Sequence, residues 1–196
     1  MSTPPTWTIR PPIYHWGTPV VLITTENEDG TFNIAPMSSA WWLGNRCMLG
    51  LGADSQSTIK LIRTRQRVIN MADDSMVGAV NVLAMTTGSK EYVKNKFSRA
   101  GLTPAASNVV RPPRITECPA QMEAGLKGVY DMMGDMDIRG FIALENIRWG
   151  GYPNRIDPDK WHPLIMSFTQ FCGLKYKKIT EPFANAVDDT TTMEKI

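Results

Sequence analysis

The chain has 196 residues, of which 42% are hydrophobic and 20% are charged, and its 21 Lys and Arg residues against 19 Asp and Glu residues give a formal net charge of +2. This is the composition of a globular protein, so we expect a single domain over residues 1–196, with a core over about 14–174 and a polar C-terminal tail. The near-neutral charge argues against nucleic acid as the main partner, because phosphate recognition needs a concentrated basic face.

Residues that often carry chemistry are scarce. The chain contains two histidines, His15 and His162, and three cysteines, Cys47, Cys118 and Cys172, without a CxxC pair. This does not support a zinc site, a metal cluster or a disulfide framework, so we predict no metal and a reducing, cytoplasmic location. The sequence also shows no apolar signal segment near its start and no apolar run long enough to span a membrane.

The first half of the chain predicts a set of short strands and two helices. Strands are expected over the apolar and β-branched runs 19–26, 31–35, 46–52 and 67–71. Asp29-Gly30 is typical of the turn of a hairpin between the first two. A helix is predicted to start at Ser55, because hydroxyl residues that can cap it precede an apolar stripe. A second, buried helix is predicted over 76–85.

The second half adds a charged helix over 91–100, a loop over 104–113 and two longer strands. Residues 119–130 and 139–149 alternate well enough to pair as antiparallel strands around Gly134-Asp135. Because strands and helices do not alternate regularly, a doubly wound parallel sheet fits poorly. The pattern favours a mainly antiparallel β-barrel of the α+β class.

One segment has the composition of a site for a flat ligand. It leaves a strand, contains a proline, and presents small and hydroxyl residues followed by two tryptophans. Close backbone approach, a few donors and an apolar wall suit a planar aromatic ring. The alternative is a strand-end loop whose tryptophans belong to the core. The candidate ligand residues are Asn33, Ala35, Pro36, Met37, Ser38, Ser39, Ala40 and Trp41.

A second segment, at the expected helix start, could bind a phosphate. Its candidate residues are Ser55, Gln56, Ser57 and Thr58. A helix N-terminus has unpaired backbone N–H groups and a dipole that favours an anion, and hydroxyl side chains add donors. The alternative is an ordinary capped helix. Together, a ring site and a phosphate site suggest a mononucleotide cofactor.

Six blocks in this order resemble a known family. They are GTPVVLITT, DGTFNIAPMSSAWW, LGLGADSQST, KFSRAGLTP, PPRITECPAQMEA and RIDPDKWHPLIMSF, and they run from about residue 14 to 174. The series is similar to the flavin-reductase-like family with the FMN-binding split-barrel fold, in its flavoredoxin-type branch.

The resemblance implies a six-stranded antiparallel Greek-key split β-barrel with inserted helices, which forms a homodimer with FMN near the subunit interface. It implies that the segment matching 33–40 lines the isoalloxazine and that the segment matching 55–58 holds the phosphate. It also places the pair Lys96-Phe97 near the cofactor.

The implied activity is that of an NAD(P)H-dependent flavin reductase, which passes electrons to free flavin or to a partner protein. Such a reductase needs no catalytic side chain, since FMN carries the hydride chemistry. The lack of a G-x-G-x-x-G motif agrees with a nicotinamide nucleotide that binds as a substrate. An FMN-binding carrier or sensor without turnover stays open as an alternative, and so does a haem-handling split barrel with His15, His162 or a cysteine as ligand.

Overall fold

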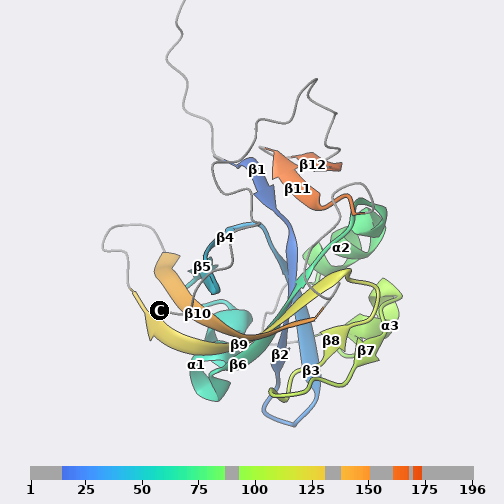
Figure 1. Ribbon diagram of the computed structural model, residues 1–196. Coiled ribbons are helices and arrows are strands. Elements are labelled where there is room, and N and C mark those ends of the chain that lie inside the picture. Colours follow the sequence, from blue (N-terminus) through green and yellow to red (C-terminus); the bar gives the residue numbers. More distant parts are fainter. Residues whose placement is uncertain (1–14, 87–92, 131–137, 151–160, 168–169, 174–196) are drawn as a thin grey trace, which may run out of the picture.

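The computed structural model describes residues 15–86, 93–130, 138–150, 161–167 and 170–173 (Figure 1). The strands are β1 Trp16–Pro19, β2 Val21–Glu26, β3 Phe32–Met37, β4 Ala40–Leu43, β5 Arg46–Gly52, β6 Gln66–Met71, β7 Pro104–Ala105, β8 Arg114–Ile115, β9 Ala120–Val129, β10 Ile138–Gly150, β11 Leu164–Ser167 and β12 Gln170–Gly173. The helices are α1 Gln56–Thr64, α2 Val77–Ala84 and α3 Lys96–Ala100, with a 3-10 turn at Asp74–Met76 before α2.

Seven strands form the main sheet, in the order β3-β2-β6-β9-β10-β5-β4. All neighbours in it are antiparallel. Two smaller sheets, β1-β11-β12 and β7-β8, complete the described strands. The mainly antiparallel α+β class is therefore confirmed. The predicted count of six strands differs from the seven of this sheet, and in the described part of the chain its edge strands β3 and β4 do not pair to close a barrel.

Several predicted elements agree with the structure and others differ. The helix predicted over 76–85 forms as α2, but it was expected to be buried, and only its Val80 and Leu83 are. Strand β7 lies within the loop predicted over 104–113. The strand over 46–52 and the helix after Ser55 are confirmed, and β9 pairs with β10 as expected. Residues 40–43 form a strand on the edge of β5, although no strand was predicted there. The helix predicted over 91–100 begins only at Lys96, because Asn95 adopts a left-handed backbone with φ of 59°. The turn at Gly134-Asp135 and the C-terminal tail lie outside the described residues.

The core lies on both sides of strand β2. Successive side chains of a strand point to opposite faces, so Val21 and Ile23 join one buried cluster while Val20 and Leu22 join another. The first cluster is lined by residues of β5, β6 and β9 and fills the concave side of the sheet. The second lies against α2, through Val80.

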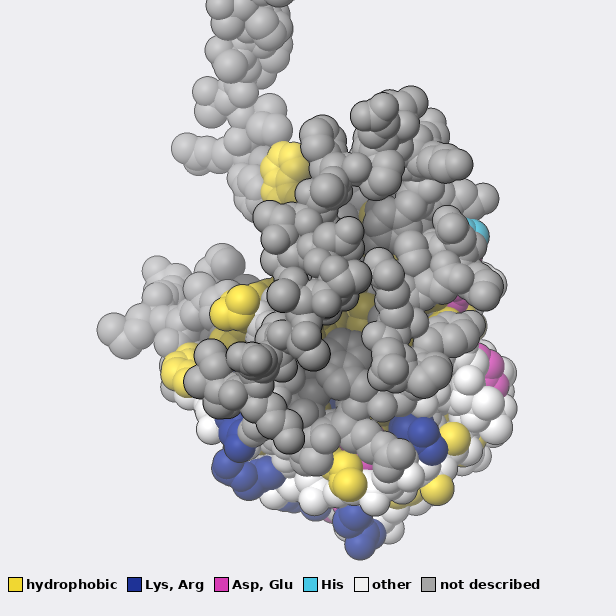
Figure 2. Space-filling view, in the orientation of Figure 1, with side chains coloured by type: hydrophobic (Ala, Val, Ile, Leu, Met, Phe, Trp, Pro, Cys, Tyr) yellow, Lys and Arg dark blue, Asp and Glu magenta, His cyan; other side chains and the backbone are white. Residues whose placement is uncertain are grey.

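The helices flank the strands. Helix α1 packs against β2 and β5, whereas α2 and α3 pack against each other and against β3 (Figure 1). None of the helices in the described ranges is long and apolar enough to cross a membrane. On the described part of the face in Figure 2, Lys and Arg side chains form separate small groups over the lower half of the view.

Arg67 of β6 is an exception to the apolar packing of the concave side. Its side chain has no exposed surface, and among the described residues none of its three guanidinium nitrogens has a hydrogen-bond partner. Burial lowers the pKa of this group to about 9. An unpaired buried charge destabilises a fold, because the free energy lost by removing the charge from water exceeds the free energy gained from its interactions in the interior.

We therefore expect Arg67→Met to stabilise the protein. An apolar side chain of similar length that replaces a buried charge raises the free energy of unfolding by about 1–4 kcal/mol in comparable cases. Urea denaturation at neutral pH measures the change. Arg65→Met is the matched control: Arg65 Nη2 donates to the carbonyl of Leu126 at 3.1 Å, so this variant should lose stability. A loss of stability in both variants would contradict the argument.

Candidate functional site

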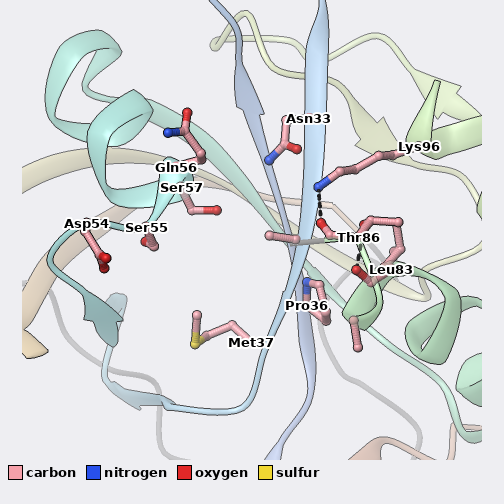
Figure 3. A pocket seen from close by; sticks show the side chains of 12 residues that line it. Asn33, Pro36, Met37, Asp54, Ser55, Gln56, Ser57, Leu83, Thr86 and Lys96 are labelled. Atoms are coloured by element: carbon pink, nitrogen blue, oxygen red, sulfur yellow. Dashed lines mark hydrogen bonds between the residues drawn. The ribbon is translucent and has the colours of Figure 1, made fainter. Parts of the chain in front are cut away.

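A pocket with a volume of about 510 Å³ opens between β3, the start of α1 and the end of α2 (Figure 3). This volume lies within the range of small-molecule sites, about 300–1,000 Å³. Its residues come from four parts of the chain: Asn33, Ala35, Pro36 and Met37 from β3; Asp54, Ser55, Gln56 and Ser57 from the start of α1; Leu83, Ala84 and Thr86 from the end of α2; and Lys96 from α3.

Strand β3 forms the central wall. It is an edge strand that pairs with β2, so its other edge faces away from the sheet. This explains why Pro36, which cannot donate to a ladder, is tolerated there. The small apolar side chains of Ala35 and Pro36 make the wall flat and apolar. At its end lies the amide of Asn33, whose Nδ2 is 3.5 Å from Thr25 Oγ1. The wall therefore combines a flat apolar surface with backbone groups at a free edge.

The start of α1 forms the polar end of the pocket. Ser55 caps the helix, because its Oγ accepts the backbone N–H of Thr58 at 3.2 Å. Ser57 is 8% exposed and lines the pocket together with Gln56. The first N–H groups of a helix have no partner within it and favour an anion, and α1 carries no acidic residue in its first turn. This end of the pocket suits a phosphate, although Asp54 adds a carboxylate beside it.

Lys96 closes the opposite side with a buried ammonium group. The side chain is 4% exposed, and Nζ donates to the carbonyl of Thr86 at 3.0 Å (Figure 3). It also donates to the carbonyl of Ile34 at 3.3 Å. Burial lowers the pKa of Lys96 to about 8, and repulsion by Lys60 contributes to the shift. An ammonium group has three donors, so two carbonyls leave one donor of Lys96 for a ligand in the pocket.

The structure brings together eight of the thirteen residues that the sequence analysis proposed. Those that line this pocket are Asn33, Ala35, Pro36, Met37, Ser55, Gln56, Ser57 and Lys96. Two distant segments, one read as a ring site and one as a phosphate site, thus share one cavity. Neither the residues at the end of α2 nor Asp54 were proposed from the sequence. The apolar run over 76–85 carries no local signal that the last turn of the helix, in which only Val80 and Leu83 are buried, faces a ligand.

The other five proposed residues lie outside this pocket. They are Ser38, Ser39, Ala40, Trp41 and Thr58. Ala40 belongs to the core on the concave side, and Trp41 is 48% exposed on β4. The hydroxyl of Thr58 is fully buried and donates to the carbonyl of Gly52 at 2.7 Å. It therefore stabilises the start of the helix and does not face the pocket.

The described histidines and cysteines also lie outside the pocket. His15 Nδ1 lies 3.0 Å from Thr18 Oγ1, and His162 Nδ1 lies 3.9 Å from Asp74. Cys47 and Cys118 are buried free thiols, as the apolar run around Cys47 predicted. Within the described ranges, no group of three or more His, Cys, Asp and Glu residues is placed to hold a metal ion.

Comparison with known proteins identifies what the chain is similar to. The model of the family described as "Flavin reductase like domain" matches residues 13–173. An uncharacterized protein of Bacillus subtilis (strain 168), YdfE, is 38% identical over 184 residues, which cover 85% of this chain and 88% of that protein.

Two solved structures show the same fold. Flavoredoxin of Desulfovibrio vulgaris (Miyazaki F) has a TM-score of 0.72 at 16% identity and covers 94% of this chain and 98% of its own. A proposed flavin reductase with a split barrel domain from Shewanella frigidimarina NCIMB 400 has a TM-score of 0.67 at 18% identity, over 80% of this chain and 82% of its own. The split-barrel fold expected from the sequence is thus supported.

The buried ammonium of Lys96 predicts a stability that depends on pH. Its pKa of about 8 in the folded state lies below the ordinary value of 10.5. Between these values the unfolded chain binds more protons, so the free energy of unfolding rises with pH. Below pH 8 the folded protein bears the full free-energy cost of burying the charged Lys96 ammonium. This cost decreases as the pH rises above 8 and Lys96 loses its proton. We expect the wild type to gain about 1–2 kcal/mol relative to Lys96→Met between pH 7.5 and 9.5.

Urea denaturation of both proteins across this pH range measures the difference. Lys94→Met serves as control, because Lys94 is exposed on the adjoining turn, and this variant should keep the pH dependence of the wild type. A wild-type curve parallel to that of Lys96→Met would contradict the prediction.

Proposed function

The chain belongs to the family of the flavin reductase like domain, and from this premise we propose that it binds FMN in the pocket beside β3 and reduces flavin with NAD(P)H. The observation that carries the proposal is the joining of three parts in one cavity: an apolar wall on β3 and α2, the N-terminus of α1, and the ammonium of Lys96. Each part matches a different portion of a flavin mononucleotide.

The residues present fit this group. Ala35, Pro36 and Leu83 offer apolar surface against which a planar ring can pack. Ser57 and the first N–H groups of α1 suit a terminal phosphate. The free donor of Lys96 suits the electron-rich oxygen and nitrogen atoms along one edge of the ring system. Among the described residues that line the pocket, the charged ones are Asp54 and Lys96, and they lie at the ends of the apolar wall (Figure 3).

When bound, the flavin supplies the redox chemistry, by accepting hydride from the nicotinamide of NAD(P)H and passing electrons to free flavin or a partner protein. The chain itself has to bind and orient the ring. The edge of β3 sets its plane, the start of α1 anchors the phosphate, and Lys96 donates a hydrogen bond and places positive charge where negative charge increases on reduction. None of these roles needs a side chain that transfers protons.

A pair of measurements tests the proposal. The purified protein should bind FMN with a perturbed flavin absorbance spectrum, and it should oxidise NADH or NADPH with saturation kinetics when free FMN is in excess. A protein that binds no flavin contradicts the proposal. Binding without turnover would instead support an FMN-binding carrier or sensor.

The phosphate end of the pocket predicts a selective loss of affinity in Ser57→Ala. A hydrogen bond to a charged group contributes about 1.5–3 kcal/mol, so the Kd for FMN should rise by about tenfold or more. Riboflavin, which has no phosphate, should bind as before. Calorimetric titration with both ligands measures the ratio. Ser75→Ala, an exposed serine outside the pocket, is the matched control and should change neither Kd. Equal losses for riboflavin and FMN would place the phosphate elsewhere.

We also propose that the protein is a homodimer and that exposed apolar residues of β1 and β4 contribute to the contact. Leu43 and Trp16 are 76% and 72% exposed, and β1 lies against β4. Figure 2 shows hydrophobic side chains at the surface in the upper and left parts of the view. Exposed apolar patches of this kind often mark interfaces.

Leu43→Asp should therefore shift the protein toward monomer, because a buried unpaired carboxylate opposes association. Sedimentation equilibrium measures the shift. Val109→Asp, at an exposed residue outside this surface, should leave the mass unchanged. A wild-type protein that is monomeric at all concentrations would contradict the proposal.

A further inference from the structure

Two carbonyl groups hold the amine of Lys96 in the wall of the pocket. Its Nζ donates to the carbonyl of Thr86 at 3.0 Å and to that of Ile34 at 3.3 Å, so it joins the end of α2 to the edge strand β3. A carbonyl oxygen accepts hydrogen bonds and cannot donate them. Two hydrogens of Nζ therefore point at these two oxygens in both the charged and the neutral form of the amine.

The third position on Nζ differs between the two protonation states. In the ammonium form it carries a hydrogen, which is a third donor. In the neutral amine the two remaining hydrogens are held by the carbonyls, and the third position is a lone pair that accepts. Because Lys96 lines the pocket beside β3, it can change from donor to acceptor toward a ligand there and keep both carbonyl bonds.

The described surroundings of Lys96 provide no counter-charge. Strand β3 and the end of α2 contain no titratable side chain. From α1, Lys60 repels the ammonium, and this repulsion adds to burial in lowering the pKa of Lys96 to about 8. Asp54 lies at the opposite end of the pocket, and Lys94 and Arg99 are exposed. Among the described residues no carboxylate forms an ion pair with Lys96, so a negative charge on a ligand would favour the ammonium form.

Reduction of a flavin supplies such a charge. A hydride brings two electrons and one proton, so the ring system gains one negative charge when it accepts a hydride. An anion next to an amine favours the protonated amine. A ring that lies against the third position of Lys96 would therefore raise the affinity of this amine for a proton on reduction and lower it again on reoxidation.

We propose that Lys96 takes up a proton from water when a flavin in the pocket is reduced, and returns it to water when the flavin is reoxidised. This inference rests on the proposed flavin site. In the reduction, NAD(P)H gives the flavin two electrons and one proton as a hydride, and water gives one proton to the amine of Lys96. This second proton stays on Lys96 and is not passed to the flavin. The negative charge gained by the ring is thus balanced inside the pocket.

Proton uptake during anaerobic electrochemical reduction of the FMN-loaded full chain tests the proposal. At pH 9 most of Lys96 is neutral before reduction, because its pKa is about 8. We expect the wild type to take up about one proton more per flavin than Lys96→Arg, since a guanidinium stays charged in both redox states. At pH 6.5 the two proteins should take up equal numbers. Lys94→Met is the matched control and should follow the wild type at both pH values.

The midpoint potential of the bound FMN gives a second measurement. One extra proton for two electrons makes the potential fall by about 30 mV more per pH unit. We expect this steeper slope above pH 8 in the wild type and in Lys94→Met, and not in Lys96→Arg or Lys96→Met. A purely structural role of Lys96 would move the potential equally at every pH and leave the slopes parallel.

The outcomes separate this inference from the proposed function. Equal proton uptake by the wild type and Lys96→Arg at pH 9, with FMN bound to both, overturns the inference and leaves the flavin site standing. Should Lys96→Arg fail to bind FMN, a wild-type potential whose slope does not change near pH 8 overturns it in the same way.

The binding step provides a further control on the place of the ammonium. At pH 9, binding of oxidised FMN or of riboflavin should cause no proton uptake at Lys96. Uptake on binding of oxidised FMN, but not of riboflavin, would assign Lys96 to the phosphate and overturn the inference. Absence of FMN binding to the wild type would overturn the proposed function and this inference with it.

Discussion

The burial of strand β2 on both of its faces determines how the rest of the molecule is arranged. Val20 to Thr25 are all buried, which is unusual for an antiparallel sheet that could expose one side to water. The sheet has to curve around one apolar cluster on its concave side, and helix α2 has to cover the other cluster. The layers of the fold follow from this one requirement.

Because β2 has no solvent-exposed face, its polar groups have to form hydrogen bonds within the protein. Thr24 Oγ1 donates to the carbonyl of Pro113 at 2.6 Å, and the buried amide of Asn70 donates to Leu22 and accepts from Ile115. These contacts fasten β8 to the sheet from distant parts of the chain. Strand β3 lies at one edge of the main sheet and β4 at the other, and the pocket lies beside β3. The pocket therefore lies where the pairing of strands in the main sheet ends.

The sequence predicts local features of this arrangement better than features made by distant contacts. The alternation of residues 46–52 and the cap at Ser55 are short-range signals, and both are confirmed. The strand at 40–43 forms because β5 supplies its partner, and no local pattern contains that information. In the same way, a hydroxyl pattern at 55–58 could not show that Thr58 turns to Gly52 while Ser57 turns to the pocket. Lys96 was found through resemblance and not through its spacing.

Two buried lysines connect the stability of the fold to its ligand. Lys96 and Lys60 are both almost fully buried, and the charge of Lys60 helps to lower the pKa of Lys96. The pKa of Lys60 is itself lowered, by burial first and by Arg63 next, while Asp29 and Glu28 act against the shift. The fold thus keeps like charges close together at a cost in stability. Proteins retain such costs mainly at functional sites. A bound phosphate would offset the repulsion, so the ligand should stabilise the folded state by more than its neutral contacts alone provide.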